Sequence, residues 1–169
     1  MVWAEVGGMK IGIRLEIQRG QMQGCLLDLK SNDQKASVID NALPAGSLHL
    51  ADLGLFKLER FQRWDKHGVY WLTRYKAGVK LYDEHGQPLA LASLLHGDQA
   101  IRLPVRVGGG RHQVRAQLLA APLPPDALAK REARLKEQAR LDQRPLSPQQ
   151  REIAGWTIYL TNVPDLSFE

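Results

Sequence analysis

The segment from residue 47 to residue 73 restricts the fold of this chain most, because it predicts two strands with a helix between them. Residues 47–51 form a short, largely apolar strand that delivers Asp52 at its C-terminal end, directly before a Leu-Gly turn. Apolar residues then recur at helical spacing until Gly68 ends the helix. Residues 69–73, Val-Tyr-Trp-Leu-Thr, are typical of a buried strand. This succession predicts an α/β fold.

Upstream of this segment the sequence predicts an antiparallel hairpin. Apolar and polar residues alternate over residues 9–17, which is the period-2 pattern of a half-buried strand. A short turn leads to a second strand at 23–29, and the Ser-Asn-Asp sequence at 31–33 is typical of a helix N-cap. No strand is expected before the first of these. We therefore predict a mixed sheet in which 47–51 lies beside this hairpin, with Asp52 at a sheet end.

Downstream of residue 74 the sequence predicts a mostly β insertion. Short candidate strands at 79–82, 101–107 and 113–120 are separated by glycine, histidine and proline turns. The three consecutive glycines at 108–110 are not followed by the Lys-Ser/Thr pair of a phosphate-binding loop, so they predict a hairpin turn.

The last third of the chain contains a charged helix and a final strand. A Pro-Pro-Asp sequence opens a helix over residues 127–141, in which basic residues outnumber acidic ones. Two prolines, Pro145 and Pro148, bracket an expected linker. Residues 156–161 are β-branched and aromatic and predict a strand.

Composition limits the class of protein. A chain of 169 residues with 44% hydrophobic and 24% charged residues is long enough for one folded domain. The single cysteine, Cys25, excludes an internal disulfide framework. No apolar run is long enough to span a bilayer and no signal peptide is evident, so we expect a cytoplasmic protein without a membrane partner. A net charge of +5 permits a polyanionic partner such as nucleic acid.

Two motifs in this order carry a family resemblance. Residues 43–56 read Leu-Pro-Ala-Gly-Ser-Leu-His-Leu-Ala-Asp-Leu-Gly-Leu-Phe, and residues 68–74 read Gly-Val-Tyr-Trp-Leu-Thr-Arg. About a hundred residues later, 156–164 contains Trp-Thr, Thr-Asn and Pro at the spacing of a return strand. The sequence resembles insertion-sequence DDE transposases over nearly the whole chain, although Leu55 and Trp71 replace the usual aromatic residues. The resemblance implies part of a ribonuclease H-like core with a mostly β insertion.

Members of that family cut a DNA strand and join its 3′ end elsewhere, which two Mg²⁺ or Mn²⁺ ions held by three acidic residues assist. Asp52 matches the second of these acids, and is therefore the expected catalytic and metal-binding residue. The alternative is that Asp52 only caps the helix that follows it. No acid matching the first or third is found, and Glu169 reads as a terminal residue. We therefore expect a fragment that is inactive and holds no metal stably by itself.

Basic residues are the candidates for contact with double-stranded DNA. Arg74 matches the arginine after the family's fifth core strand, and Lys76 follows it closely. The charged helix adds further cations that could lie along a DNA backbone. The alternative is a solvated helix face on which Glu132 and Glu137 pair with nearby cations. The predicted DNA-binding set is Arg74, Lys76, Arg131, Arg134, Lys136 and Arg140.

These observations predict three regions: a partial ribonuclease H-like core at 1–76, a β-rich insertion with a basic helix at 77–150, and a return strand at 151–169. The predicted function is that of part of a DNA transposase. Two alternatives are a non-catalytic nucleic-acid-binding module and an inactive transposase remnant held together by self-association as a homodimer.

Overall fold

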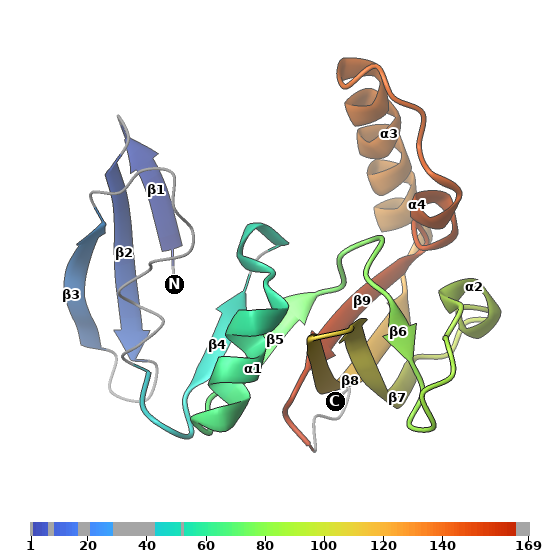
Figure 1. Ribbon diagram of the computed structural model, residues 1–169. Helices are drawn as coiled ribbons and strands as arrows, with labels where there is room; N and C mark the ends of the chain where they lie inside the picture. The colour runs from blue at the N-terminus through green and yellow to red at the C-terminus, as the bar shows by residue number, and fades with distance from the viewer. Residues whose placement is uncertain (1, 7–8, 17–20, 29–42, 52, 165–169) are drawn as a thin grey trace.

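The computed structural model describes residues 2–6, 9–16, 21–28, 43–51 and 53–164. The first of its two sheets consists of β1 (Val2–Val6), β2 (Met9–Glu16) and β3 (Gln21–Asp28), paired antiparallel in that order (Figure 1). The pairing of β2 with β3 confirms the predicted hairpin. The expectation that no strand precedes residue 9 is wrong, because β1 pairs with β2 along its full length. Its Val-Trp-Ala-Glu-Val sequence is rich in β-forming residues.

The second sheet has six strands in the order β4-β5-β9-β8-β7-β6. Only β4 and β5 are parallel to each other, and every other neighbouring pair is antiparallel. The mixed α/β class is therefore confirmed. The strands are β4 (Leu48–Ala51), β5 (Tyr70–Arg74), β6 (Leu81–Tyr82), β7 (Ile101–Gly109), β8 (His112–Pro122) and β9 (Trp156–Thr161).

One predicted neighbour relationship is wrong. We expected β4 to lie beside the β2–β3 hairpin in one sheet, but in the described residues β4 is an edge strand of the second sheet and pairs only with β5. Hydrophobic alternation identifies a strand and its buried face, but it does not identify the neighbouring strand. The ribonuclease H-like arrangement of the core accordingly stays a prediction.

The helices cover the second sheet unevenly. They are the 3-10 turn η2 (Leu53–Leu55) and the α-helices α1 (Leu58–Lys66), α2 (Leu91–Leu94), α3 (Pro125–Leu141) and α4 (Pro148–Glu152). The α1 helix packs against β5 and β8, so that Phe61 and Trp64 are almost completely buried. The Phe61 ring stacks on Trp71 of β5, with ring centroids 4.4 Å apart. Burial of each such side chain contributes about 1.5–3 kcal/mol, so this aromatic group anchors the core.

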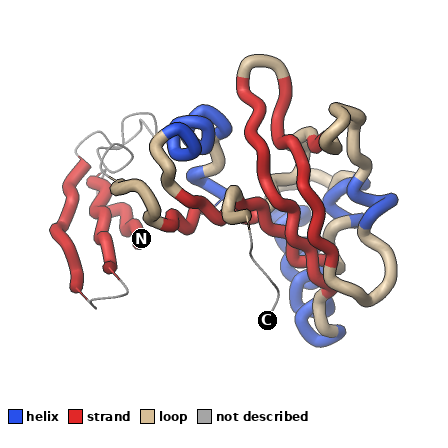
Figure 2. Tube along the Cα trace, turned by 90° about the horizontal axis from the view of Figure 1, so that it is seen from below, coloured by secondary structure: helices blue, strands red, loops and turns tan. Residues whose placement is uncertain are grey.

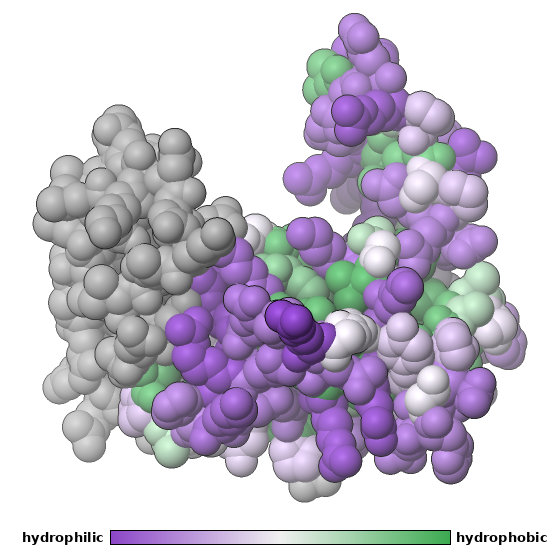
Figure 3. Space-filling model, viewed as in Figure 1, coloured by the Kyte–Doolittle hydropathy of each residue, from purple (hydrophilic) through white to green (hydrophobic). Residues whose placement is uncertain are grey.

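The α3 helix has no buried residue and projects from the sheet, with a largely hydrophilic surface (Figures 1 and 3). The chain after it corrects another expectation, since Pro148 begins the short helix α4 and does not close a linker. The Ser147 hydroxyl accepts a hydrogen bond from the Gln150 backbone N–H, and the Gln150 side chain accepts one from the Ser147 N–H. This reciprocal capping box satisfies backbone donors at the start of α4.

The β7–β8 hairpin is the longest paired segment in the described chain and extends from the body of the molecule (Figure 2). Gly108 near the end of β7 and Gly110 in the turn are both at positive φ, and the pairing of Gly109 with His112 confirms the predicted hairpin turn. No helix in the described part of the chain is long and apolar enough to cross a membrane.

Candidate nucleic-acid interface

A groove of about 590 Å³ lies where β5 ends and β9 begins. Because β4 and β5 are parallel and in register, with Ala51 opposite Thr73, their carboxyl ends meet at one edge of the sheet. Ligands of open α/β sheets bind in crevices outside the carboxyl ends of strands. The groove lies beside the carboxyl ends of this parallel pair, where Leu53 follows β4 and Arg74 ends β5.

Cationic side chains from two distant segments line this groove. Arg74 comes from the end of β5, whereas Lys130, Arg131 and Arg134 come from α3. Arg134 lies one helical turn from both Lys130 and Arg131, and residues three or four apart are neighbours on a helix surface, so Arg134 lies beside both on the side of α3 that lines the groove. The fold thus brings together three of the six sequence-predicted residues: Arg74, Arg131 and Arg134.

Arg131 also supports the structure. Its guanidinium Nη1 donates to the Trp156 carbonyl oxygen at 2.6 Å and to the Ala154 carbonyl oxygen at 3.4 Å. These bonds join the middle of α3 to the start of β9. Since the rest of α3 has little buried contact, Arg131 is one of the groups that fix the helix orientation relative to the sheet.

The electrostatics of the groove favour an anion. Burial lowers the pKa of Arg131, and the positive charge of Arg74 lowers it further, while Tyr159 acts in the opposite direction. An arginine nevertheless stays charged at neutral pH. The two guanidinium groups therefore repel each other, and a bound phosphate would relieve that repulsion.

The other three predicted residues do not line the groove. Lys76 lies exposed beyond the end of β5, and Lys136 is exposed on α3 outside the groove lining. Arg140 forms a bidentate ion pair with Glu137, with nitrogen–oxygen distances of 2.7 and 2.9 Å. The ion pair is the alternative to DNA contact that the sequence suggested for this part of α3. The hydrogen bond to Glu137 also raises the pKa of Arg140.

Asp52 lies outside the described residues. The residues on either side of it are described: Ala51 ends β4, and Leu53 lines the groove. Among the described residues, no group of three or more histidine, cysteine, aspartate or glutamate side chains is arranged to hold a metal ion.

Sequence reasoning missed the tyrosine that forms one wall of the groove. The Tyr75 hydroxyl donates to the Val79 carbonyl oxygen at 2.8 Å and accepts from Gln149 Nε2 at 3.0 Å. Burial raises the pKa of Tyr75, although the Gln149 bond opposes this, so the phenol is neutral at physiological pH. No local sequence pattern predicts this contact, because Gln149 of α4 comes close to Tyr75 only in the folded chain.

The relatives found by comparison with known proteins are transposases of insertion sequences. The transposase for insertion sequence element IS231F of Bacillus thuringiensis subsp. israelensis is 24% identical over 183 aligned residues, covering 95% of this chain and 38% of the relative. The IS231B transposase of subsp. berliner is 28% identical over 88 residues, and the IS231D transposase of subsp. finitimus is 29% identical over 87 residues. Each of these two matches covers 50% of this chain and 18% of the relative.

No family model matches the sequence, and no solved structure matches it. The chain spans well under half the length of the transposases that it resembles. The identities are low, but one alignment covers nearly the whole chain. Over most of its length, this chain is a distant homologue of the insertion-sequence transposases of the IS231 type.

Proposed function

We propose that this chain is a DNA-binding part of an insertion-sequence transposase and that the groove between β5, β9 and α3 receives the sugar–phosphate backbone of double-stranded DNA. One observation carries the proposal: Arg74, Arg131 and Arg134 converge on one groove at the carboxyl edge of the sheet. Cations that neutralise phosphates supply most of the sequence-independent affinity for DNA. The homology to transposases supports DNA as the partner.

The catalytic part of the proposal concerns the complete enzyme. There, Asp52 would be one ligand of the Mg²⁺ or Mn²⁺ ions that stabilise the attacking and leaving oxygens during strand cleavage and strand transfer. A single carboxylate cannot hold a pair of ions that each need about six ligands. We therefore assign no catalytic step to residues 1–169 alone. In a chain extended to the full length of the relatives, Asp52→Asn is expected to abolish cleavage while DNA binding persists.

The experiment for the groove compares two double variants that lose the same charge. Arg74→Gln/Arg134→Gln removes two groove cations, whereas Lys136→Gln/Arg140→Gln removes two cations of α3 that lie outside the groove lining. Arg131 is left intact in both variants, because its bonds to β9 support the fold. Binding to a fluorescein-labelled 30-base-pair duplex is followed by fluorescence anisotropy over a series of salt concentrations.

We expect the groove variant to bind roughly tenfold or more weakly at 0.1 M salt, and the slope of log K against log salt to flatten by about 0.9 per lost phosphate contact. The control variant is expected to keep most of the affinity and the slope. Equal losses in the two variants would mean that only net charge matters and would overturn the groove assignment. Absence of DNA binding by the unmodified chain would overturn DNA as its partner.

The alternative of a non-catalytic DNA-binding module predicts the same binding data. It differs in the extended chain, where Asp52→Asn would leave every activity unchanged because Asp52 would serve only as a cap. The same variant thus separates a transposase from a binding module.

A further inference from the structure

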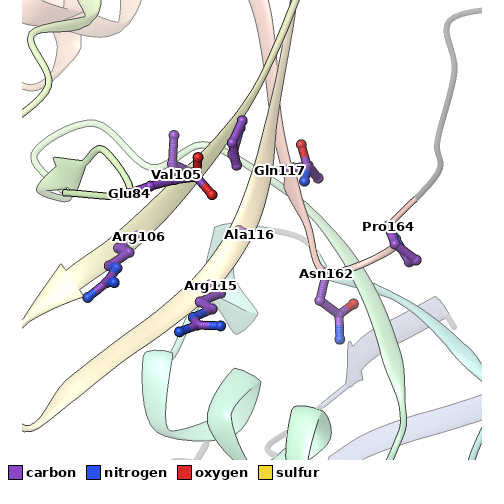
Figure 4. Close-up of a pocket in the computed structure, with 9 residues that line it drawn as sticks. Glu84, Val105, Arg106, Arg115, Ala116, Gln117, Asn162 and Pro164 are labelled. Atoms are coloured by element: carbon purple, nitrogen blue, oxygen red, sulfur yellow. The ribbon is translucent and has the colours of Figure 1, made fainter. Parts of the chain in front are cut away.

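The β7–β8 hairpin carries a second basic site, separate from the groove. Buried and exposed residues alternate along both strands, so that Val105, Val107 and Val114 belong to the core while Arg106 and Arg115 lie on the other face. Figure 4 shows the two arginine side chains extending in the same direction from neighbouring strands. They form one wall of a shallow pocket of about 380 Å³.

The two arginines are direct cross-strand partners. The register places Arg106 opposite Arg115, which brings their Cβ atoms to about 4.5–5.5 Å from each other. Like charges in this position destabilise a sheet. Among the described residues, neither guanidinium group has an ion-pair partner. An unpaired like-charge couple is a costly arrangement for a hairpin unless an anion is bound between the two groups.

The surroundings of the pair suit an extended anion. The pocket is shallow and is completed by Pro104, Gln117 and the chain at Asn162 and Pro164. Gln117 adds an amide donor on the same face, and arginine forks match the oxygens of a phosphodiester. Arg102, four residues before Arg106 and therefore on the same face, donates to the Pro164 carbonyl oxygen, so it helps to hold this wall of the pocket.

We propose that Arg106 and Arg115 form a second phosphate-binding site, through which the β7–β8 hairpin contacts the backbone of double-stranded DNA. The inference rests on the proposed function, since it takes DNA as the partner. The groove uses residues 156–158 at the start of β9, whereas this pocket uses residues that follow its end. Along β9, the four residues from Ile158 in the groove to Asn162 in this pocket span roughly 13 Å at about 3.3 Å per residue. The sites are therefore separable by substitution.

Glu84, an acid in the same pocket, provides a second test of the inference. The Glu84 carboxylate lines the same pocket but forms no ion pair with either arginine among the described residues. A bound phosphate would experience repulsion from this carboxylate. Removing the charge of Glu84 should therefore strengthen DNA binding, which is an effect opposite to that of removing an arginine.

The test uses the whole chain of 169 residues, a labelled 30-base-pair duplex, and four variants: Arg106→Gln, Arg115→Gln, Glu84→Gln and the control Lys66→Gln. Each arginine variant is expected to bind roughly five- to tenfold more weakly at 0.1 M salt, with a salt slope reduced by about 0.9. Glu84→Gln is expected to bind more tightly. Lys66 is an exposed cation at the end of α1, and its variant should bind within about twofold of the unmodified chain.

Thermal unfolding supplies a second readout. Because each arginine variant removes a like-charge pair, its Tm is expected to stay unchanged or to rise by about 1–2 °C. Weaker binding combined with undiminished stability would support a binding site. A large fall in Tm for both variants would show that the arginines serve the fold and would overturn the proposal.

Different experimental outcomes would overturn this inference and the proposed function. If Arg106→Gln and Arg115→Gln bind as the unmodified chain does while Arg74→Gln/Arg134→Gln binds weakly, the hairpin site is wrong and the groove stands. If the unmodified chain does not bind the duplex, both proposals are wrong.

Discussion

The amide Nδ2 of Asn162 donates a hydrogen bond of 2.7 Å to Oδ1 of Asp65, and this bond joins the end of β9 to the last turn of α1. The same Asn162 amide reaches the Val69 carbonyl oxygen at 3.0 Å, and its Oδ1 accepts from the Trp71 backbone N–H at 2.7 Å. The indole of Trp71 donates to Asp65 as well, at 2.9 Å. Asn162 thus lies at the centre of a network that joins three elements.

This network joins two sequence motifs that lie far apart in the chain. The Thr-Asn pair at the end of β9 contacts the Trp71 segment of β5 through both side chains, since the Thr161 hydroxyl donates to the Trp71 carbonyl oxygen at 2.6 Å. Thr161 and Trp71 are both almost completely buried. Thr161 and Asn162 therefore hold β5, one strand of the parallel pair, against the return strand β9.

We expect Asn162→Ala to destabilise the chain by about 2–4 kcal/mol. The substitution leaves the Trp71 N–H without its partner, and an unsatisfied buried donor costs about 1–3 kcal/mol in addition to the other lost bonds. Urea unfolding followed by tryptophan fluorescence measures the change. Gln138→Ala, which removes an exposed amide bonded to Asp142, is the control and should change the free energy of unfolding by less than about 0.5 kcal/mol. A similar small change for Asn162→Ala would contradict the role of the network.

Asp65 makes stability depend on pH in a direction that can be predicted. Partial burial raises its pKa from 3.8, and the bonds from Trp71 and Asn162 oppose this rise without cancelling it. The folded state therefore binds the proton more tightly than the unfolded state does. The stability contributed by the protonated carboxyl is complete below the unfolded pKa and is lost as the pH rises through the folded pKa.

The isosteric variant Asp65→Asn removes this titration. We expect the stability of the unmodified chain, relative to Asp65→Asn, to fall as the pH is raised from about 3.5 to 6.5, a range that begins below the ordinary aspartate pKa. Parallel urea titrations of the two proteins at several pH values give the difference directly, because other titrating groups are common to both. A difference that grows with pH would mean that the hydrogen bonds outweigh burial at this carboxyl.

Local signals in the sequence predicted most of the individual elements. The strand predicted at 156–161 is β9, and the predicted helix at 127–141 is α3 with two additional residues at its start. The strand β1 and the helices α2 and α4 were missed, although Ser147 and Gln150 have the spacing of a capping box, which could have identified α4. Short elements have weak periodicity, so cap residues are the better evidence for them.

The sequence predicted less well which distant segments lie next to each other in the fold. Nothing in the residues around Arg74 indicates that α3 will lie beside it, because that proximity arises only when β9 inserts between β5 and β8. The separation of β4 from the β2–β3 hairpin has the same origin, since pairing depends on long-range packing. The role of Asp52 and of the six predicted cations stays a prediction.

Gly108 in the β7–β8 hairpin is expected to tolerate no side chain. Its φ is +92°, and a Cβ atom would lie 2.3 Å from Leu58 Cδ1 and 2.4 Å from the His112 carbonyl oxygen. Gly110 also has a positive φ, of +62°, but a Cβ atom there would meet nothing within 4 Å. Comparing Gly110→Ala with Gly108→Ala therefore separates the cost of backbone strain from the cost of steric overlap.

We therefore expect Gly110→Ala to cost about 1–2 kcal/mol, the penalty of a left-handed conformation for an L-residue. Gly108→Ala should cost at least about 2 kcal/mol more, because the overlap with a backbone oxygen requires the hairpin to shift. Thermal and urea unfolding of both variants measure the two costs. Equal costs would mean that both the Leu58 side chain and the hairpin backbone at His112 shift with little loss of stability.

Arg131 allows support of the fold to be separated from binding within one helix. Arg131→Lys keeps the positive charge but loses the guanidinium Nη1 that donates to the Trp156 and Ala154 carbonyl oxygens, so we expect it to lower the free energy of unfolding by about 1–2 kcal/mol. Arg134→Lys, one turn further along the same face, should be neutral to within about 0.5 kcal/mol. Urea unfolding of the two variants gives the comparison, and equal stabilities would show that the Arg131 bonds do not fix α3. If the loss is found only at Arg131, weakened DNA binding by any Arg131 variant reports displacement of α3 as well as loss of a cation. The phosphate contacts of the groove are then measured through Arg74 and Arg134.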